Sequence, residues 1–275
     1  MKLAYLGTPS IAVPPLRALH AAGHDIDLVV TGPDARRGRG NATSPSPVKV
    51  AATELGLPVA HDPDALLGSD AVLGVVVAFG SILKPHLLAH LPMVNLHFSL
   101  LPRWRGAAPV ERAILAGDEL TGVCVMAVEE GLDTGGVYAS ATTDVGTKTL
   151  HELWDELSDT GARLLVEWLP TAFVGDTLVA PTPQEGEVTY AAKLTADDRR
   201  LDPSMAPDRL LAVVRLGNAW TTVGAPDAPK RLKVLAAHVE NGRFHLDVVQ
   251  PEGKRPMPAD EWRRGTPVDH RGGFS

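Results

Sequence analysis

The fold follows from the stretch Val94-Asn95-Leu96-His97-Phe98-Ser99-Leu100-Leu101-Pro102. Its polar side chains, Asn95, His97 and Ser99, alternate with apolar ones, and on a β-strand such residues share one face. Leu101-Pro102 ends the strand, at the position where open α/β sheets bind ligands. An amide and an imidazole there can both reach one small polar atom. The alternation alone fits a solvated strand edge with a structural histidine equally well.

Outward from this stretch, buried strands alternate with amphipathic helices. We expect strands at Lys2–Leu6, Ile26–Val30 and Ala71–Ala78, with a helix from Ile11 to Ala22 between the first two. This β-α-β order predicts an α/β fold with a parallel sheet. Gly7-Thr8-Pro9 is not the G-x-G-x-x-G fingerprint, so the sequence does not indicate a nicotinamide cofactor.

An acidic, glycine-rich loop, residues 129–136, follows a further strand at Val123–Val128. It carries Asp133, whose carboxylate could orient an imidazole and stabilise its protonated form. The simpler interpretation, an aspartate that bonds its own turn, stays open on spacing alone.

Asn95, His97 and Asp133, with Ser99-Leu100-Leu101-Pro102 between them, resemble the catalytic signature of the formyltransferases that use 10-formyltetrahydrofolate. The run from Ser99 to Pro109, which continues as Arg-Trp-Arg-Gly-Ala-Ala-Pro, is most similar to the members that act on methionyl-tRNA. The resemblance extends from Met1 to about Asp202 and more weakly to the C-terminus.

The resemblance implies a Rossmann-like, mostly parallel formyltransferase domain over residues 1–178, a linker over 179–192 and a shortened OB-like β-barrel over 193–275. In the last part we expect a helix at Arg209–Leu216. Strands should follow at Ala219–Val223, Arg231–Val239 and Phe244–Val249.

The implied activity transfers the formyl group of 10-formyltetrahydrofolate to the amino group of methionyl initiator tRNA. Asn95 would donate to the formyl oxygen. His97 would stabilise that oxygen or shuttle a proton, and Asp133 would orient His97. The implied contacts with the folate co-substrate are Phe79, Gly80, Ile82, Leu83, Ser99, Leu100, Leu101, Pro102, Gly131 and Leu132. Ser99 should also shape the turn into Pro102.

Arginines on two segments are the candidate tRNA contacts. Arg36, Arg37 and Arg39 lie in a long loop, residues 31–47, and Arg103 and Arg105 flank Trp104. Guanidinium groups suit phosphate contacts, although a solvated charge cluster is an equal alternative. Net charge is −10 over residues 1–189 and +3 over residues 190–275. Tail cations that could face RNA are Lys230, Arg231, Lys233, Lys254, Arg255, Arg263 and Arg264.

Other features bound the class of protein. The single cysteine, Cys124, excludes an internal disulfide and fits a reducing compartment. No signal peptide and no apolar run of membrane-spanning length is evident, so we expect a cytoplasmic protein, as a monomer. His86 and His90 have the spacing of a zinc pair but no glutamate between them and no third ligand, so we expect no metal.

Two alternatives remain at the sequence level. An N-formyltransferase acting on an amino sugar nucleotide would share Asn95, His97 and Asp133 and would need no basic loop. A folate- or tRNA-binding relative without transfer activity would fit the short tail, although the intact triad argues against it.

Overall fold

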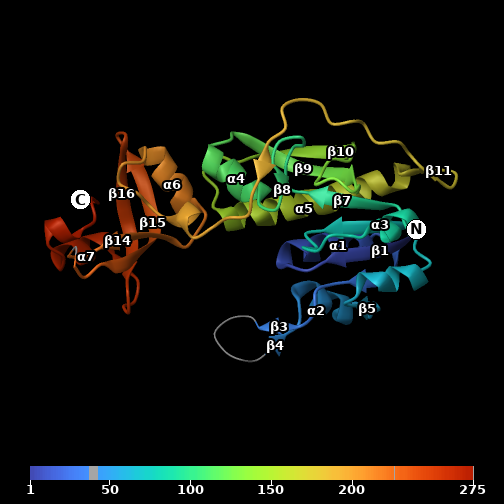
Figure 1. Cartoon of the computed structure of the whole chain (residues 1–275), viewed down its shortest axis with the longest axis horizontal. Helices are drawn as coiled ribbons and strands as arrows, with labels where there is room; N and C mark the ends of the chain where they lie inside the picture. Colours follow the sequence, from blue (N-terminus) through green and yellow to red (C-terminus); the bar gives the residue numbers. More distant parts are fainter. Residues whose placement is uncertain (37–42, 226, 275) are drawn as a thin grey trace. The chain divides into compact units, whose positions relative to one another are not determined.

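The structure, a computed structural model, describes residues 1–36, 43–225 and 227–274. The chain divides into two compact units (Figure 1). The N-terminal unit comprises Met1–Pro109, Leu120–Asp144 and Trp154–Ala191, and the C-terminal unit comprises Val110–Glu119, Val145–Leu153 and Ala192–Ser275.

A seven-stranded sheet with the order β10-β9-β7-β6-β1-β2-β5 forms the centre of the N-terminal unit. The strands β5, β2, β1, β6 and β7 pair in parallel, whereas β9 and β10 are antiparallel. Their bounds are β1 Lys2–Gly7, β2 Asp25–Val30, β5 Val59–Ala60, β6 Leu73–Val77, β7 Met93–His97, β9 Leu120–Ala127 and β10 Val137–Asp144. The expected mostly parallel α/β sheet is confirmed.

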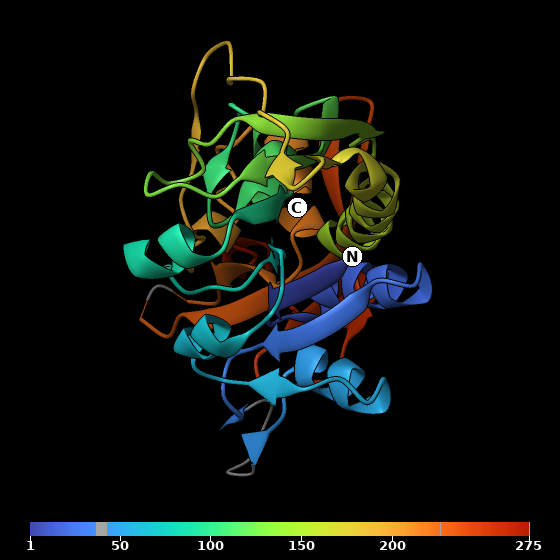
Figure 2. The same ribbon diagram turned by 90° about the vertical axis from the view of Figure 1, so that its right-hand side faces the viewer.

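Helices cover both faces of this sheet (Figure 2). On one face lie α1 (Val13–Ala21) and α5 (Leu150–Trp168). Gly161 of α5 packs so closely on Leu96 that a Cβ at Gly161 would lie 2.5 Å from Leu96 Cδ2. The helix α2 (Pro47–Glu54) packs against α1, and the hydroxyl of Ser46 caps its first turn by accepting the Lys49 N–H. On the other face lies α3 (Pro85–His90). Leu96 alternates with Asn95 and His97, so these two polar side chains point away from α5.

The core on the α3 face is continuous. Every residue of β6 is buried, as a central parallel strand requires. Buried side chains from four strands, from a 3-10 helix at Pro63–Gly68 and from the segment after β6 meet two leucines of the α3 region in one cluster: Ala4, Leu6, Val30, Leu66, Val76, Phe79, Leu87, Leu91 and Met93. Burial of each leucine contributes about 1.5–3 kcal/mol. This cluster supports the strands that carry the polar residues.

A threonine ties three strand ends together at the carboxyl edge of the sheet. Thr8, just past β1, donates its hydroxyl to the carbonyl of Phe79, which follows β6 (3.2 Å). The same hydroxyl accepts the N–H of Gly32, which follows β2 (3.2 Å). Because β7 is parallel to these strands, its last residue, His97, ends at the same edge.

The C-terminal unit contains an antiparallel sheet with the order β14-β15-β16-β17. The bounds are β14 Ala219–Val223, β15 Lys230–Glu240, β16 Arg243–Pro251 and β17 Met257–Pro258, with α6 at Pro207–Arg215 and α7 at Ala259–Arg264. The unit also holds most of α4 (Pro109–Ala116). The expected small β domain after the α/β domain is confirmed, while the exact boundaries 178, 192 and 193 stay a prediction.

Shorter pairs complete the fold: β3 (Ala35–Arg36) with β4 (Thr43–Ser44), β11 (Phe173–Val174) with β12 (Thr177–Leu178), and β8 (Arg105–Gly106) with β13 (Tyr190–Ala191). In the part of the chain that the structure describes, no helix combines the length and apolar character needed to cross a bilayer.

Candidate active site

The strand β7 carries Asn95 and His97 on one face, as the alternation predicted. Asn95 lies opposite Val76 of β6 and Met126 of β9, and its side chain is half-buried. The strand ends at His97, so Ser99 lies beyond it, contrary to the expectation that Ser99 continues the strand. The reason is a turn: the Ser99 hydroxyl donates to the carbonyl of Arg103 (2.5 Å), and the Arg103 N–H donates to the carbonyl of Leu100 (3.1 Å).

Both ring nitrogens of His97 face polar groups, and only 5% of the residue is exposed. Its Nε2 lies 2.9 Å from the carbonyl oxygen of Trp104. A carbonyl only accepts, so Nε2 carries a proton and donates it. Nδ1 faces Asp133, 3.7 Å from Oδ2. In the neutral ring, Nδ1 is therefore the nitrogen with a lone pair, and it is the place where His97 can take up a proton.

The surroundings of His97 favour a neutral ring at pH 7. Burial lowers the pKa of His97 below its ordinary value of 6.5, because the charged ring would lose its hydration. The carboxylate of Asp133 and the carbonyl of Trp104 raise this pKa and offset part of the effect. His97 is thus a neutral base flanked by two groups that can stabilise its protonated form.

Asp133 is fixed by a bond to a distant segment. Its Oδ2 accepts the N–H of Gly106 over 2.7 Å, so the carboxylate does not simply bond its own turn. Asp133 itself has φ +51°. Gly106 has φ +116°, and a Cβ there would lie 3.0 Å from the carbonyl oxygen of Ala191. This position therefore requires glycine.

Trp104 presents the carbonyl that His97 needs, in a left-handed conformation with φ +62°. Its N–H donates to Thr189 Oγ1 (2.9 Å), and the guanidinium of Arg103 stacks on its ring, 4.5 Å from the centroid. Arg105 donates from Nε and Nη2 to Gln184 Oε1 (3.0 and 2.7 Å). The contacts of Thr189 and Gln184 were missed at the sequence level, where both residues lay in the predicted linker.

The candidate folate residues fall into two groups. The side chain of Phe79 (7% exposed) belongs to the core, and Leu83 packs against it. In contrast, Ile82 is 95% exposed and Leu132 is 62% exposed. Gly80 has φ +80° and is exposed, as is Gly131.

The remaining four candidates lie around the turn after β7. Ser99 and Pro102 are buried, and Leu100 and Leu101 are half-buried. Leu100 and Leu101 line a cavity of about 350 Å³ together with Cys124, Tyr138 and Gln184.

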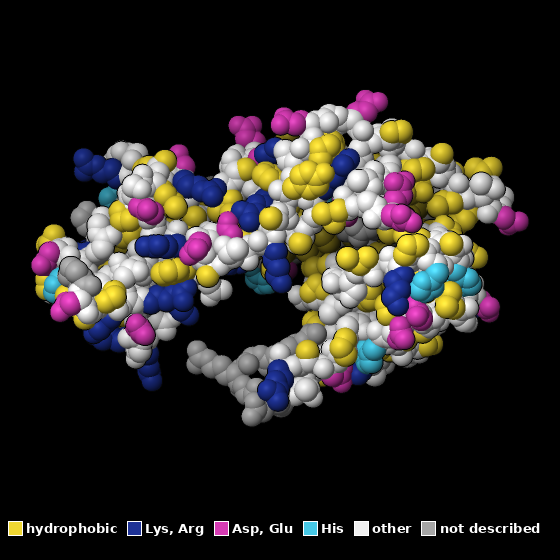
Figure 3. All heavy atoms as spheres, viewed as in Figure 1, with side chains coloured by type: hydrophobic (Ala, Val, Ile, Leu, Met, Phe, Trp, Pro, Cys, Tyr) yellow, Lys and Arg dark blue, Asp and Glu magenta, His cyan; other side chains and the backbone are white. Residues whose placement is uncertain are grey.

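The candidate tRNA residues are described only in part. Arg36 is exposed on β3, and Arg103 is exposed beside Trp104. Arg37 and Arg39 lie outside the described residues. Figure 3 shows Lys and Arg side chains gathered on the displayed face of the C-terminal unit. Of the seven tail cations named above, Lys230, Arg231, Lys233, Lys254, Arg255 and Arg264 are exposed, whereas Arg263 is half-buried and pairs with Asp260 (2.8 Å).

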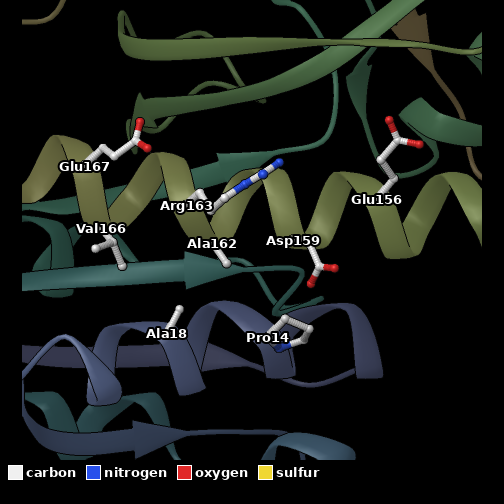
Figure 4. A pocket seen from close by; sticks show the side chains of 8 residues that line it. All are labelled: Pro14, Ala18, Glu156, Asp159, Ala162, Arg163, Val166 and Glu167. Atoms are coloured by element: carbon white, nitrogen blue, oxygen red, sulfur yellow. The ribbon is translucent and has the colours of Figure 1, made fainter.

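Two other features lie away from these groups. A groove of about 690 Å³ between α1 and α5 is lined by Pro14, Ala18, Glu156, Asp159, Ala162, Arg163, Val166 and Glu167 (Figure 4). It contains none of the predicted site residues and lies on the sheet face opposite Asn95 and His97.

His86 pairs with Asp64 (3.0 Å). Among the described residues, no three His, Cys, Asp or Glu side chains are grouped to hold a metal ion.

Comparison with known proteins assigns the family. The model of the formyl transferase family matches residues 1–169. The chain belongs to the formyl transferase family. A methionyl-tRNA formyltransferase of Clavibacter sepedonicus is 41% identical over 298 residues, covering 96% of this chain and 97% of the relative. Membership confirms the enzyme class expected from the resemblance, a formyl-transferring enzyme.

Two solved structures share the fold of this formyl transferase family member. Methionyl-tRNA formyltransferase from Clostridium thermocellum matches with a TM-score of 0.59 and 16% identity, over 91% of this chain and 98% of its own. HypX from Aquifex aeolicus, in complex with tetrahydrofolic acid, matches with a TM-score of 0.66 and 14% identity, over 95% of this chain and 46% of its own.

Proposed function

We propose that this protein transfers the formyl group of 10-formyltetrahydrofolate to the amino group of methionyl initiator tRNA. The observation that carries the proposal is the 41% identity, over nearly the full length of both chains, to a relative named methionyl-tRNA formyltransferase. The arrangement of His97 between Asp133 and the Trp104 carbonyl supplies the chemistry.

The transfer needs an electrophile, an oxyanion site and a proton acceptor. The amine nitrogen forms a bond to the formyl carbon, the bond from that carbon to N10 breaks, and one proton moves from the amine to N10. Asn95 donates its amide N–H to the formyl oxygen as negative charge develops on it. Removing one such donor typically costs about 3–4 kcal/mol of transition-state stabilisation.

His97 moves the proton. Its Nδ1 accepts the proton of the attacking amine, directly or by way of Asp133, because Nε2 is already protonated. The resulting imidazolium lies between a carboxylate and a carbonyl, which both stabilise the positive charge. His97 then returns the proton to the leaving nitrogen. Neutral His97 is the form that starts this cycle.

The described residues fit a folate. Exposed Ile82 and Leu132 offer apolar surface to a flat ring, and the segment at Gly80 leaves backbone groups accessible. For the acceptor tRNA, we propose phosphate contacts from Arg36, Arg37, Arg39 and Arg103 and from the exposed tail cations. Arg105 has two N–H groups engaged with Gln184, so any tRNA contact would use its remaining ones.

The experiment is a formyl-transfer assay with 10-formyltetrahydrofolate and two acceptors, charged methionyl initiator tRNA and an amino sugar nucleotide, at low and raised salt. We expect transfer to the tRNA that weakens with salt, since phosphate contacts are salt-sensitive. Transfer to the sugar nucleotide alone would overturn the proposal, and so would an absence of transfer to either acceptor. We also propose that the protein acts in the cytoplasm as a monomer. The buried free thiol of Cys124 suits a reducing compartment.

A further inference from the structure

Residues 182–191, which we call the strap, lie along the loops that hold His97. At one end Thr182 pairs with Val137 through two backbone hydrogen bonds of 2.7 and 2.9 Å. At the other end β13 pairs in parallel with β8. Regular backbone pairing at both ends therefore holds the strap in the N-terminal unit. Between these ends, two side chains of the strap form hydrogen bonds with the loops that contain Trp104 and Asp133.

Gln184 bonds the Asp133 loop from the strap. Its Nε2 donates to the carbonyls of Asp133 (2.9 Å) and Gly135 (2.7 Å). Its Oε1 accepts both bonds from Arg105. The amide thus uses its donors on one side and its acceptor on the other, and only an amide can satisfy both sides. A carboxylate at this position would face two carbonyl oxygens with no proton to give.

Thr189 bonds the Trp104 loop from the strap. Its hydroxyl accepts the Trp104 N–H, and its carbonyl accepts the Arg105 N–H (both 2.9 Å). These two bonds hold the peptide groups on either side of the Trp104 Cα, and the second group contains the carbonyl that accepts from His97 Nε2. Thr189 therefore supports the loop whose carbonyl accepts from Nε2 of His97. Gln184 supports the backbone of Asp133, whose carboxylate faces Nδ1.

The two loops need such support because each contains a non-glycine residue with positive φ, Trp104 at +62° and Asp133 at +51°. Such a conformation is unfavourable for a residue with a side chain and persists only where surrounding contacts hold it. The strap supplies hydrogen bonds to both: to the N–H of Trp104 and to the carbonyl of Asp133.

We propose that the strap sets the orientation and the tautomer of His97, with Gln184 and Thr189 as positioning residues for the proton transfer. Neither residue needs to touch a substrate. In metal sites, removal of a group that orients a ligating histidine typically costs about 10–100-fold in activity, and we expect a comparable loss here. The inference rests on the proposed function for its kinetic consequence but not for its structural one.

The test uses full-length variants with altered strap side chains. Gln184→Glu keeps the shape and removes the donors, and Thr189→Val removes the hydroxyl whereas Thr189→Ser keeps it. We expect kcat to fall about 10–100-fold in Gln184→Glu and Thr189→Val, with KM for both substrates nearly unchanged, and Thr189→Ser to retain activity. Gln250→Glu is the matched control, because Gln250 also donates to a carbonyl, that of Lys254, in the C-terminal unit.

A second readout needs no substrate. The ring of His97 can be titrated by NMR in each folded variant, with His97→Asn to assign its signals. We expect the pKa of His97 to shift in Gln184→Glu and Thr189→Val and to stay unchanged in Gln250→Glu. An unchanged pKa together with full activity in Gln184→Glu and Thr189→Val would overturn the strap proposal. If the wild type transfers no formyl group to methionyl-tRNA, the proposed function fails, but the NMR shift still decides the role of the strap.

Discussion

At the residue scale, one backbone carbonyl decides which nitrogen of His97 is free to act. The Trp104 carbonyl accepts a hydrogen bond from the N–H of Nε2, so the lone pair of the neutral ring is on Nδ1, facing Asp133. Without that carbonyl, Asp133 would favour the proton on Nδ1, and the lone pair would be on Nε2, on the side of the ring away from Asp133. The roles of Asn95 and His97 lead to two predictions.

The first prediction concerns the oxyanion donor. Asn95→Asp keeps the size of the side chain and removes the N–H donor, so kcat should fall about 10²–10³-fold. Asn95 is half-buried and outside the apolar core, so the fold should remain. Steady-state kinetics and circular dichroism check both statements. Unchanged turnover in a folded Asn95→Asp enzyme would exclude Asn95 as the donor.

The second prediction concerns titration of His97. Its pKa lies below 6.5 in the folded protein because of burial, so the folded state resists protonation. Burying the neutral ring therefore contributes fully to stability above pH 6.5, and stability is lost as the pH falls from 6.5 toward the folded pKa. Asp133→Asn removes a group that raises this pKa and should lower it further. An NMR titration checks the direction; a pKa that rises in Asp133→Asn would contradict this account.

At the element scale, a close backbone approach holds the loop that carries Asp133 against the sheet. Gly135 follows Asp133 by two residues, and a Cβ there would lie 2.0 Å from the carbonyl oxygen of Ala127 in β9. Gly136 accepts the N–H of Ala127 through its carbonyl (2.9 Å). The loop therefore crosses the end of β9 with no room for a side chain, which holds Asp133 close to the sheet.

The third prediction follows from this crossing. Gly135→Ala must push the loop away from β9, so we expect a loss of about 1–3 kcal/mol in the free energy of unfolding, with reduced kcat. Gly68→Ala is the control, because a Cβ there meets nothing within 4 Å. Its effect should stay within about 0.5 kcal/mol. Denaturant unfolding of the two variants should separate them, and equal stability would refute the steric argument.

At the scale of the whole molecule, charge is unevenly distributed along the chain. Residues 1–189 carry a net charge of −10 and residues 190–275 carry +3. An acidic body repels a polyanion, so an RNA substrate would be attracted chiefly by local clusters of cations. In the C-terminal unit, Lys230 and Lys233 are exposed on β15, beside Arg231 stacked on Trp220 (4.2 Å).

The fourth prediction tests these cations. If both lysines contact phosphate, the double variant Lys230→Ala, Lys233→Ala should bind tRNA more weakly and should reduce the salt slope by about 1 per lost contact. Arg163→Ala, in the groove between α1 and α5, is the control and should leave the slope unchanged. Binding measured over a salt series is the check. An unchanged slope in the double variant would remove these lysines from the RNA contact.

The amino-acid sequence by itself determined the features that local periodicity encodes. Alternation of polar and apolar residues from Val94 to His97 identified the strand β7 and the shared face of Asn95 and His97, although the same pattern wrongly extended the strand to Ser99. A continuous apolar run identified β6. Asn95, His97, Asp133 and the run from Ser99 to Pro109 identified the family. These signals are readable because each depends on neighbours within a few residues in the chain.

Only the tertiary structure decided how His97 and Asp133 are held. The end of β7 at His97 depends on the turn that Ser99 closes, and Gln184 and Thr189 act on residues 51 and 85 positions away. Such bonds leave no periodic pattern, because they join side chains to backbone groups that chain folding brings together. A Pro- and Gly-rich segment that contains Gln184 is therefore interpreted as a linker until the hydrogen-bond partners of that glutamine are known.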